Sequence, residues 1–94
     1  GAEPERRWQM IQLQLVGNDR AGIVRDITQL LARHGVNLES LDTDVLPAPM
    51  SSELLFRAEA RLAVPSELSL DELQEHLETL ADDLMVELKL QPAD

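Results

Sequence analysis

Several residue types are scarce or missing in this sequence of 94 residues, which contains no cysteine, one tryptophan and one phenylalanine. Without cysteine there can be no disulfide, no thiolate nucleophile and no thiolate metal ligand. A domain of this size without such cross-links fits a cytoplasmic location. No apolar run has the length of a membrane span, and no signal-like apolar segment is seen. The scarcity of aromatic rings removes the stacking platforms of single-strand nucleic-acid binders.

Basic residues are also few, with 8 Lys and Arg against 18 Asp and Glu and a formal net charge of −10. A field of this sign repels phosphate backbones, so we expect no direct binding of nucleic acid. Any effect that a chain of this charge has on nucleic acid is expected to pass through a protein partner. The length fits one domain, which we expect over residues 9–91, after a linker or cloning remnant at 1–8 and before a tail at 92–94.

Hydrophobic periodicity predicts four strands. Apolar and polar side chains alternate in three segments, which is typical of strands with one buried face. A fourth segment, after the first helix, changes phase, and this change predicts a bulge between Leu38 and Leu41. The strands are predicted at residues 8–16, 36–46, 53–64 and 84–90.

Two amphipathic helices are predicted between these strands. The first runs from Ile23 to His34, with apolar residues every three or four positions, and Gly35 is expected to end it. The second begins at Ser69, which has capping-box spacing to Glu72. The order β-α-β-β-α-β with right-handed crossovers predicts an α+β, ferredoxin-like βαββαβ sandwich, in which two helices cover one face of a four-stranded antiparallel sheet.

The loop from Gly17 to Gly22, between the first strand and the first helix, is the first place where chemistry could occur. A helix N-terminus offers unpaired amides that bind carboxylates, and Gly22 would let a ligand approach the amides of Gly22 and Ile23. Asn18 and Asp19 could hold an amino group or cap the helix. Spacing alone favours a plainer reading, a capped turn that needs two glycines.

Asn37, at the start of the second predicted strand, could hydrogen-bond a ligand held at a neighbouring loop or satisfy local backbone groups.

The sequence offers no recognisable set of catalytic residues. His34 and His76 are expected at a helix end and on a solvated helix face, and no serine has a credible base partner. The sequence therefore predicts no catalytic residue, no metal site, no cofactor and no enzyme.

Around the same loop the sequence resembles a known family. Residues 15–24 (LVGNDRAGIV) and 31–38 (LARHGVNL) resemble an ACT domain, a family with the βαββαβ fold and a D-R-P-G-type turn before its first helix. Residues 53–65 and 80–86 are similar to one subgroup, the ACT domains of glycine cleavage system transcriptional repressor-like proteins, particularly the second domain. The usual proline of the turn is Ala21 here, which leaves the loop less pre-organised.

The resemblance implies a regulatory sensor of a small amino acid, with glycine and serine as candidates, that works as a homodimer or packed against a second ACT domain. Ligands in that family commonly lie at an interface between ACT domains, where the first loop and a polar residue at the start of the second strand meet them. A ligand-free dimerisation module of the same fold is the alternative. The matching ligand-binding positions are Asn18, Asp19, Ala21, Gly22, Ile23 and Asn37.

Overall fold

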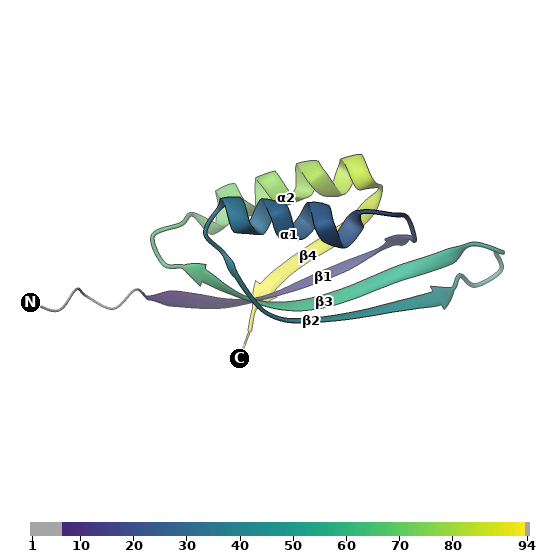
Figure 1. Ribbon diagram of the computed structural model, residues 1–94, viewed down its shortest axis with the longest axis horizontal. Coiled ribbons are helices and arrows are strands. Elements are labelled where there is room, and N and C mark those ends of the chain that lie inside the picture. The colour runs from purple at the N-terminus through teal and green to yellow at the C-terminus, as the bar shows by residue number, and fades with distance from the viewer. Residues whose placement is uncertain (1–6, 94) are drawn as a thin grey trace, which may run out of the picture.

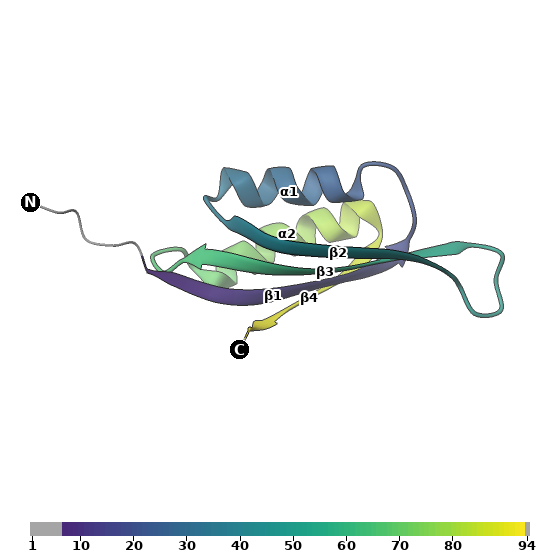
Figure 2. The ribbon, with the colours of Figure 1, turned by 60° about the horizontal axis from the view of Figure 1, so that its bottom comes forward.

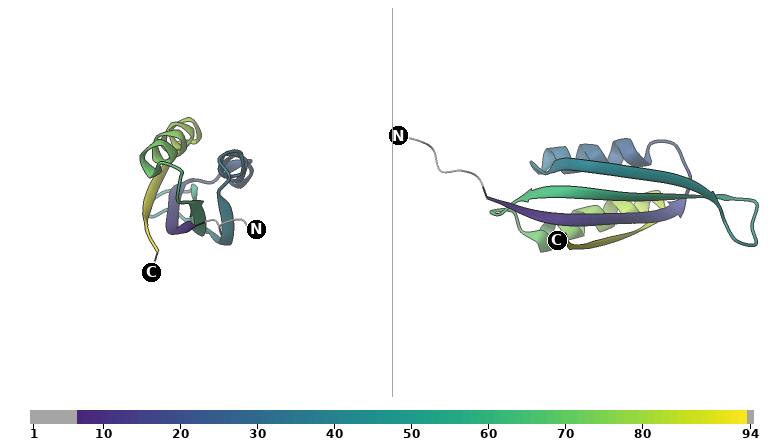
Figure 3. Two further views of the ribbon diagram at one scale, coloured as in Figure 1. Left: turned by 90° about the vertical axis from the view of Figure 1, so that its left-hand side faces the viewer. Right: turned by 90° about the horizontal axis from the view of Figure 1, so that it is seen from below.

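The computed structural model describes residues 7–93 and has the βαββαβ architecture that the sequence predicts. The four strands form one antiparallel sheet in the order β2-β3-β1-β4. Both helices lie on the same face of this sheet, α1 on the side of β2 and α2 on the side of β4 (Figures 1 and 3). The elements are β1 (Trp8–Asn18), α1 (Ile23–Arg33), β2 (Asn37–Pro47), β3 (Leu54–Pro65), α2 (Leu70–Leu84) and β4 (Val86–Pro92).

The first strand, β1, begins at Trp8, and the last strand, β4, ends at Pro92. Most of the expected linker, residues 1–6, lies outside the described residues, as does residue 94 of the expected tail. Within residues 7–93, neither helix has the length and apolar character needed to cross a membrane.

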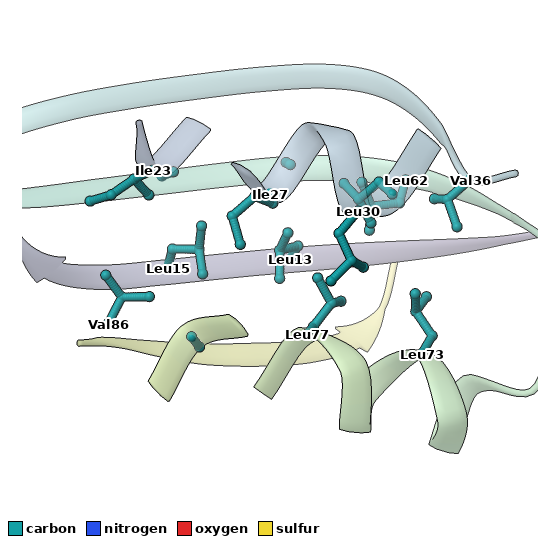
Figure 4. Packing of buried hydrophobic residues seen from close by; sticks show 14 of the residues in the cluster. Leu13, Leu15, Ile23, Ile27, Leu30, Val36, Leu62, Leu73, Leu77 and Val86 are labelled. Atoms are coloured by element: carbon teal, nitrogen blue, oxygen red, sulfur yellow. The ribbon is translucent and has the colours of Figure 1, made fainter. Parts of the chain in front are cut away.

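The core fills the space between the helices and the inner face of the sheet (Figure 4). Ala58 and Ala60 of β3 are buried beneath the helices, where their small side chains let the helices approach. Full burial of each large aliphatic side chain stabilises the fold by about 1.5–3 kcal/mol. Among the residues that the structure describes, the largest fully buried side chains are Leu13, Ile23, Leu31, Leu62, Val64, Leu73 and Leu77.

The second strand occupies an edge of the sheet and contains the predicted bulge. Its pairing with β3 shifts register between Leu38 and Ser40, which confirms the phase change seen in the sequence. All 11 of its residues are exposed. The hairpin that joins β2 to β3 projects beyond both helices (Figure 2).

The start of α2 confirms the sequence prediction, whereas the end of α2 corrects it. Ser69 caps the helix, because its hydroxyl accepts a hydrogen bond from the Glu72 amide at 3.3 Å. Leu84, which was expected to begin the last strand, is the final residue of α2. Met85 then turns the chain with a left-handed φ of 59°, so the strand begins one residue later at Val86.

Candidate functional site

Gly17 belongs to β1 and not to the turn, which corrects the expectation that this glycine breaks the strand. It pairs with Phe56 of β3 on one side and with Val86 of β4 on the other. A Cβ built on Gly17 would lie 2.5 Å from Cγ1 and 2.9 Å from Cα of Val86. The sequence needs glycine at this position because β4 passes too close for any side chain.

The turn into α1 depends instead on Gly22. Gly22 is the N-cap residue with φ 88° and ψ −1°, a left-handed conformation that glycine adopts without a steric penalty. No side chain caps the helix, so the expectation that Asn18 or Asp19 could do so is wrong. The first helical bond runs from the Asp26 amide to the Gly22 carbonyl at 2.9 Å. The amides before Asp26, among them that of Ile23, have no intrahelical acceptor.

The rest of the loop is held from two sides. The backbone amide of Asp19 donates to the Leu54 carbonyl at the start of β3, at 3.0 Å. The Arg20 guanidinium donates to the carbonyl of Leu84 at the end of α2, at 3.5 Å. The loop exposes the side chains of Asn18, Asp19 and Ala21 to solvent. Ile23, in contrast, is 2% exposed and belongs to the core. Ile23 can therefore offer a ligand only its backbone amide.

Arg25 is a residue of this site that the sequence reasoning missed. Its Nη2 lies 3.1 Å from the position that a Cβ would take on Gly22, so the guanidinium sits beside the helix N-terminus. Its Nε also lies 3.4 Å from Oδ1 of Asp26. The signal was present in the sequence, because a residue three positions after an N-cap glycine lies on the same side of the first helical turn.

Asn37 lies far from the other candidates within one chain. It begins β2, pairs with Ala63 and is exposed. The loop at Gly22 precedes α1 and Asn37 follows it, so the two lie at opposite ends of that helix (Figure 1). The 11 residues of α1 span about 16 Å. One chain therefore cannot bring both to the same small amino acid.

A small apolar cleft opens between α1 and β2. Val24 and Thr28 of the helix and Leu38 and Leu41 of the strand line its mouth, above Ala58 and other inner-face residues of the sheet. The cavity is about 20 Å³, the volume that one water-sized group occupies. Its lining is almost entirely apolar, so it suits a methyl-sized apolar group better than a polar one.

A family model described as the ACT domain matches residues 5–86. The chain belongs to the ACT domain family. ACT domains are regulatory modules that bind small amino acids and often dimerise. The match includes the Gly17–Gly22 loop, α1 and Asn37, so every candidate ligand-binding residue lies within the matched part of the ACT domain.

Solved structures similar to this ACT domain include a protein of unknown function from Galdieria sulphuraria, with 30% identity, a TM-score of 0.85, and coverage of 100% of this chain and 54% of the other. An ACT domain protein from Streptococcus pneumoniae shares 22% identity with a TM-score of 0.76 and 90% coverage of both chains. A candidate glycine cleavage system transcriptional repressor shares 21% identity with a TM-score of 0.76, over 97% of this chain and 49% of its own. The chain thus spans about half the length of two of these relatives. The curated proteins contain no match.

Proposed function

We propose that this ACT domain senses a small amino acid, with glycine and serine as the first candidates, and passes the signal to a protein partner. We place it in the cytoplasm, in a transcriptional or metabolic regulator of the glycine cleavage repressor type. Because an ACT domain is a regulatory module, the proposal concerns sensing and not catalysis. One observation carries it: the first turn of α1 has no side-chain cap, and its N-cap is a left-handed glycine.

The chemistry of the loop supports a zwitterionic ligand. Unpaired amides and the positive end of the α1 dipole attract a carboxylate, and the guanidinium of Arg25 adds a cation beside them. In this proposal the exposed side chains of Asn18 and Asp19 accept hydrogen bonds from the ammonium group of the ligand. Asn37 can join this set only from a neighbouring ACT domain, because in its own chain the length of α1 separates it from the loop.

A ligand-free assembly module remains the second candidate, and Asp26 favours it. This aspartate lies in the first turn of α1, where its own carboxylate interacts with the helix dipole. It also pairs with Arg25 at 3.4 Å, and its Oδ2 lies 3.9 Å from the position of a Cβ on Gly22. An external carboxylate would have to compete with Asp26 for the same positive groups.

Calorimetric titration of the domain with glycine, serine and leucine separates the two candidates. Sensing predicts heat and a raised melting temperature with at least one of these amino acids at millimolar concentration. The assembly module predicts neither, and that result would remove the sensing proposal.

Two glycine variants locate the site. Gly22→Ala and Gly35→Ala each place a side chain at a left-handed φ, 88° and 72°, and each should cost about 1–2 kcal/mol of stability. Only Gly22 adjoins the unpaired amides, so only Gly22→Ala should weaken amino-acid binding, by tenfold or more. Arg25→Gln removes the charge without changing the backbone and should weaken binding less. Equal affinities in all three variants would place the ligand elsewhere.

A further inference from the structure

The two histidines of this chain meet where the two helices lie side by side. His34 is the C-cap residue of α1, and His76 is an exposed residue of α2. Their ring centroids are 4.8 Å apart, and the ring planes are tilted by 44°. The sequence contains no other histidine and no cysteine. Imidazole and thiolate, the ligands that most transition metals prefer, are therefore available at this one place only.

A hydrogen bond determines which nitrogen of His34 is available to a ligand. Nδ1 of His34 lies 2.9 Å from the carbonyl oxygen of Leu30. Because a carbonyl oxygen only accepts, Nδ1 carries the proton, and Nε2 of the neutral ring keeps its lone pair. Histidines in metal sites are oriented in the same way, since the ring nitrogen that does not bind the metal donates to a carbonyl or a carboxylate. His34 is thus held as a metal ligand is held.

The separation of the two rings suits one shared cation. Zn²⁺ binds imidazole nitrogens at about 2.0–2.1 Å in tetrahedral geometry, which places the centroids of two such rings about 5 Å apart. The observed separation is 4.8 Å. Aromatic rings that merely pack together also lie about 4.5–7 Å apart, so a metal titration is needed to separate the two cases.

Two histidines supply only half of a tetrahedral coordination sphere. Within residues 7–93, no cluster of three or more His, Asp or Glu side chains is arranged to hold a metal ion. Water or a group from another molecule therefore fills the other positions, whereas structural zinc sites take all four ligands from protein. Because His76 is exposed, a hydrated cation can reach it. The net charge of −10 also attracts cations to the chain.

We propose that His34 and His76 form a reversible binding site for a divalent transition-metal ion that prefers imidazole, such as Zn²⁺, Ni²⁺ or Cu²⁺. The cation joins the C-terminal end of α1 to α2, close in the sequence to Asn37. Because the two ligands meet only in the folded chain, bound metal stabilises the fold. The inference goes beyond the proposed function, since it needs no amino acid and no second domain. It also revises the expectation of no metal site, because only the packing of the helices brings the two histidines together.

Calorimetric titration of the whole chain, without a histidine tag, measures the binding of Zn²⁺. One saturable equivalent per chain is expected. His34→Gln and His76→Gln should each weaken binding roughly tenfold or more, because each leaves a single imidazole. Glutamine at residue 34 keeps an N–H that can donate to the Leu30 carbonyl, so the end of α1 is preserved. Glu75→Gln is the matched control, because it removes a charge next to His76 and keeps both rings.

Two outcomes of this titration would overturn the proposal. Binding that both histidine variants retain would place the metal on carboxylates, and Glu75→Gln would then be as harmful as either of them. Binding that His76→Gln abolishes and His34→Gln leaves intact would show a single exposed imidazole and no shared site.

Thermal unfolding and NMR give a second test. Zn²⁺ should raise the melting temperature of the unmodified chain and should not raise that of either histidine variant. Mg²⁺, which prefers oxygen ligands, should not distinguish the three chains. The ring protons of both histidines should shift together as Zn²⁺ is added. A shift confined to His76, or a melting temperature that Zn²⁺ leaves unchanged, would refute the inference. No amino acid is present in these experiments, so their failure leaves the sensing proposal standing.

Discussion

Replacing Gly17 by alanine tests the contact between β1 and β4. Gly17 is not among the glycines with positive φ, so alanine fits its backbone conformation. The new Cβ would lie 2.5 Å from Cγ1 and 2.9 Å from Cα of Val86. Carbon atoms prefer separations of about 3.5–4.0 Å, so the strands must move apart. Overpacking of this kind costs about 1–3 kcal/mol, and alanine recovers about 0.4–1 kcal/mol by restricting the unfolded chain.

Because the new Cβ meets the backbone Cα of Val86 as well as its side chain, the overpacking cost is expected in the upper part of that range, at about 2–3 kcal/mol. The expected net loss for Gly17→Ala is therefore about 1–2.6 kcal/mol, or a melting temperature lowered by roughly 4–21 °C for a domain of this size. Thermal and urea unfolding followed by circular dichroism measure it. Adding Val86→Ala removes Cγ1 but leaves Cα and Cβ, so the cost of Gly17→Ala should become smaller without vanishing in that background. A neutral or stabilising Gly17→Ala would show that β4 does not approach β1 as described.

Substitutions at three further residues probe other parts of the fold. Leu77→Ala, at a side chain with 0% exposure, should lower the free energy of unfolding by about 2–5 kcal/mol in urea titration. Ser69→Ala removes the hydrogen bond to the Glu72 amide and should cost about 1 kcal/mol, whereas Ser69→Asp should restore most of it. Met85→Gly relieves the left-handed φ of 59° and should raise the melting temperature; a fall would contradict the strain at this residue.

Local periodicity was sufficient to predict the architecture. Apolar and polar side chains alternate along β1 and β3, and apolar residues recur at helical spacing along α1. Both patterns arise because each element buries one face, and the same burial stabilises the fold. The bulge in β2 was predicted for the same reason, since the phase of the apolar residues changes between Leu38 and Leu41. Element ends were less accurate, because Leu84 fits the apolar pattern of both α2 and β4.

The site was harder to predict because it depends on contacts between distant segments. Gly17 looked like a turn residue, and only its position beside Val86 shows why it is glycine. The ring centroids of His34 and His76 lie 4.8 Å apart. The sequence pattern of either helix taken alone does not predict this contact. The sequence analysis did not single out Arg25, whose guanidinium lies beside the left-handed Gly22.

The position of Asn37 at the far end of α1 from Gly22 has a thermodynamic consequence. A ligand that touches both residues must bridge two domains, so binding and association become linked equilibria. Each then strengthens the other by the same factor. The apparent affinity for the amino acid would rise with protein concentration, and the response threshold of the sensor would follow the abundance of the regulator itself.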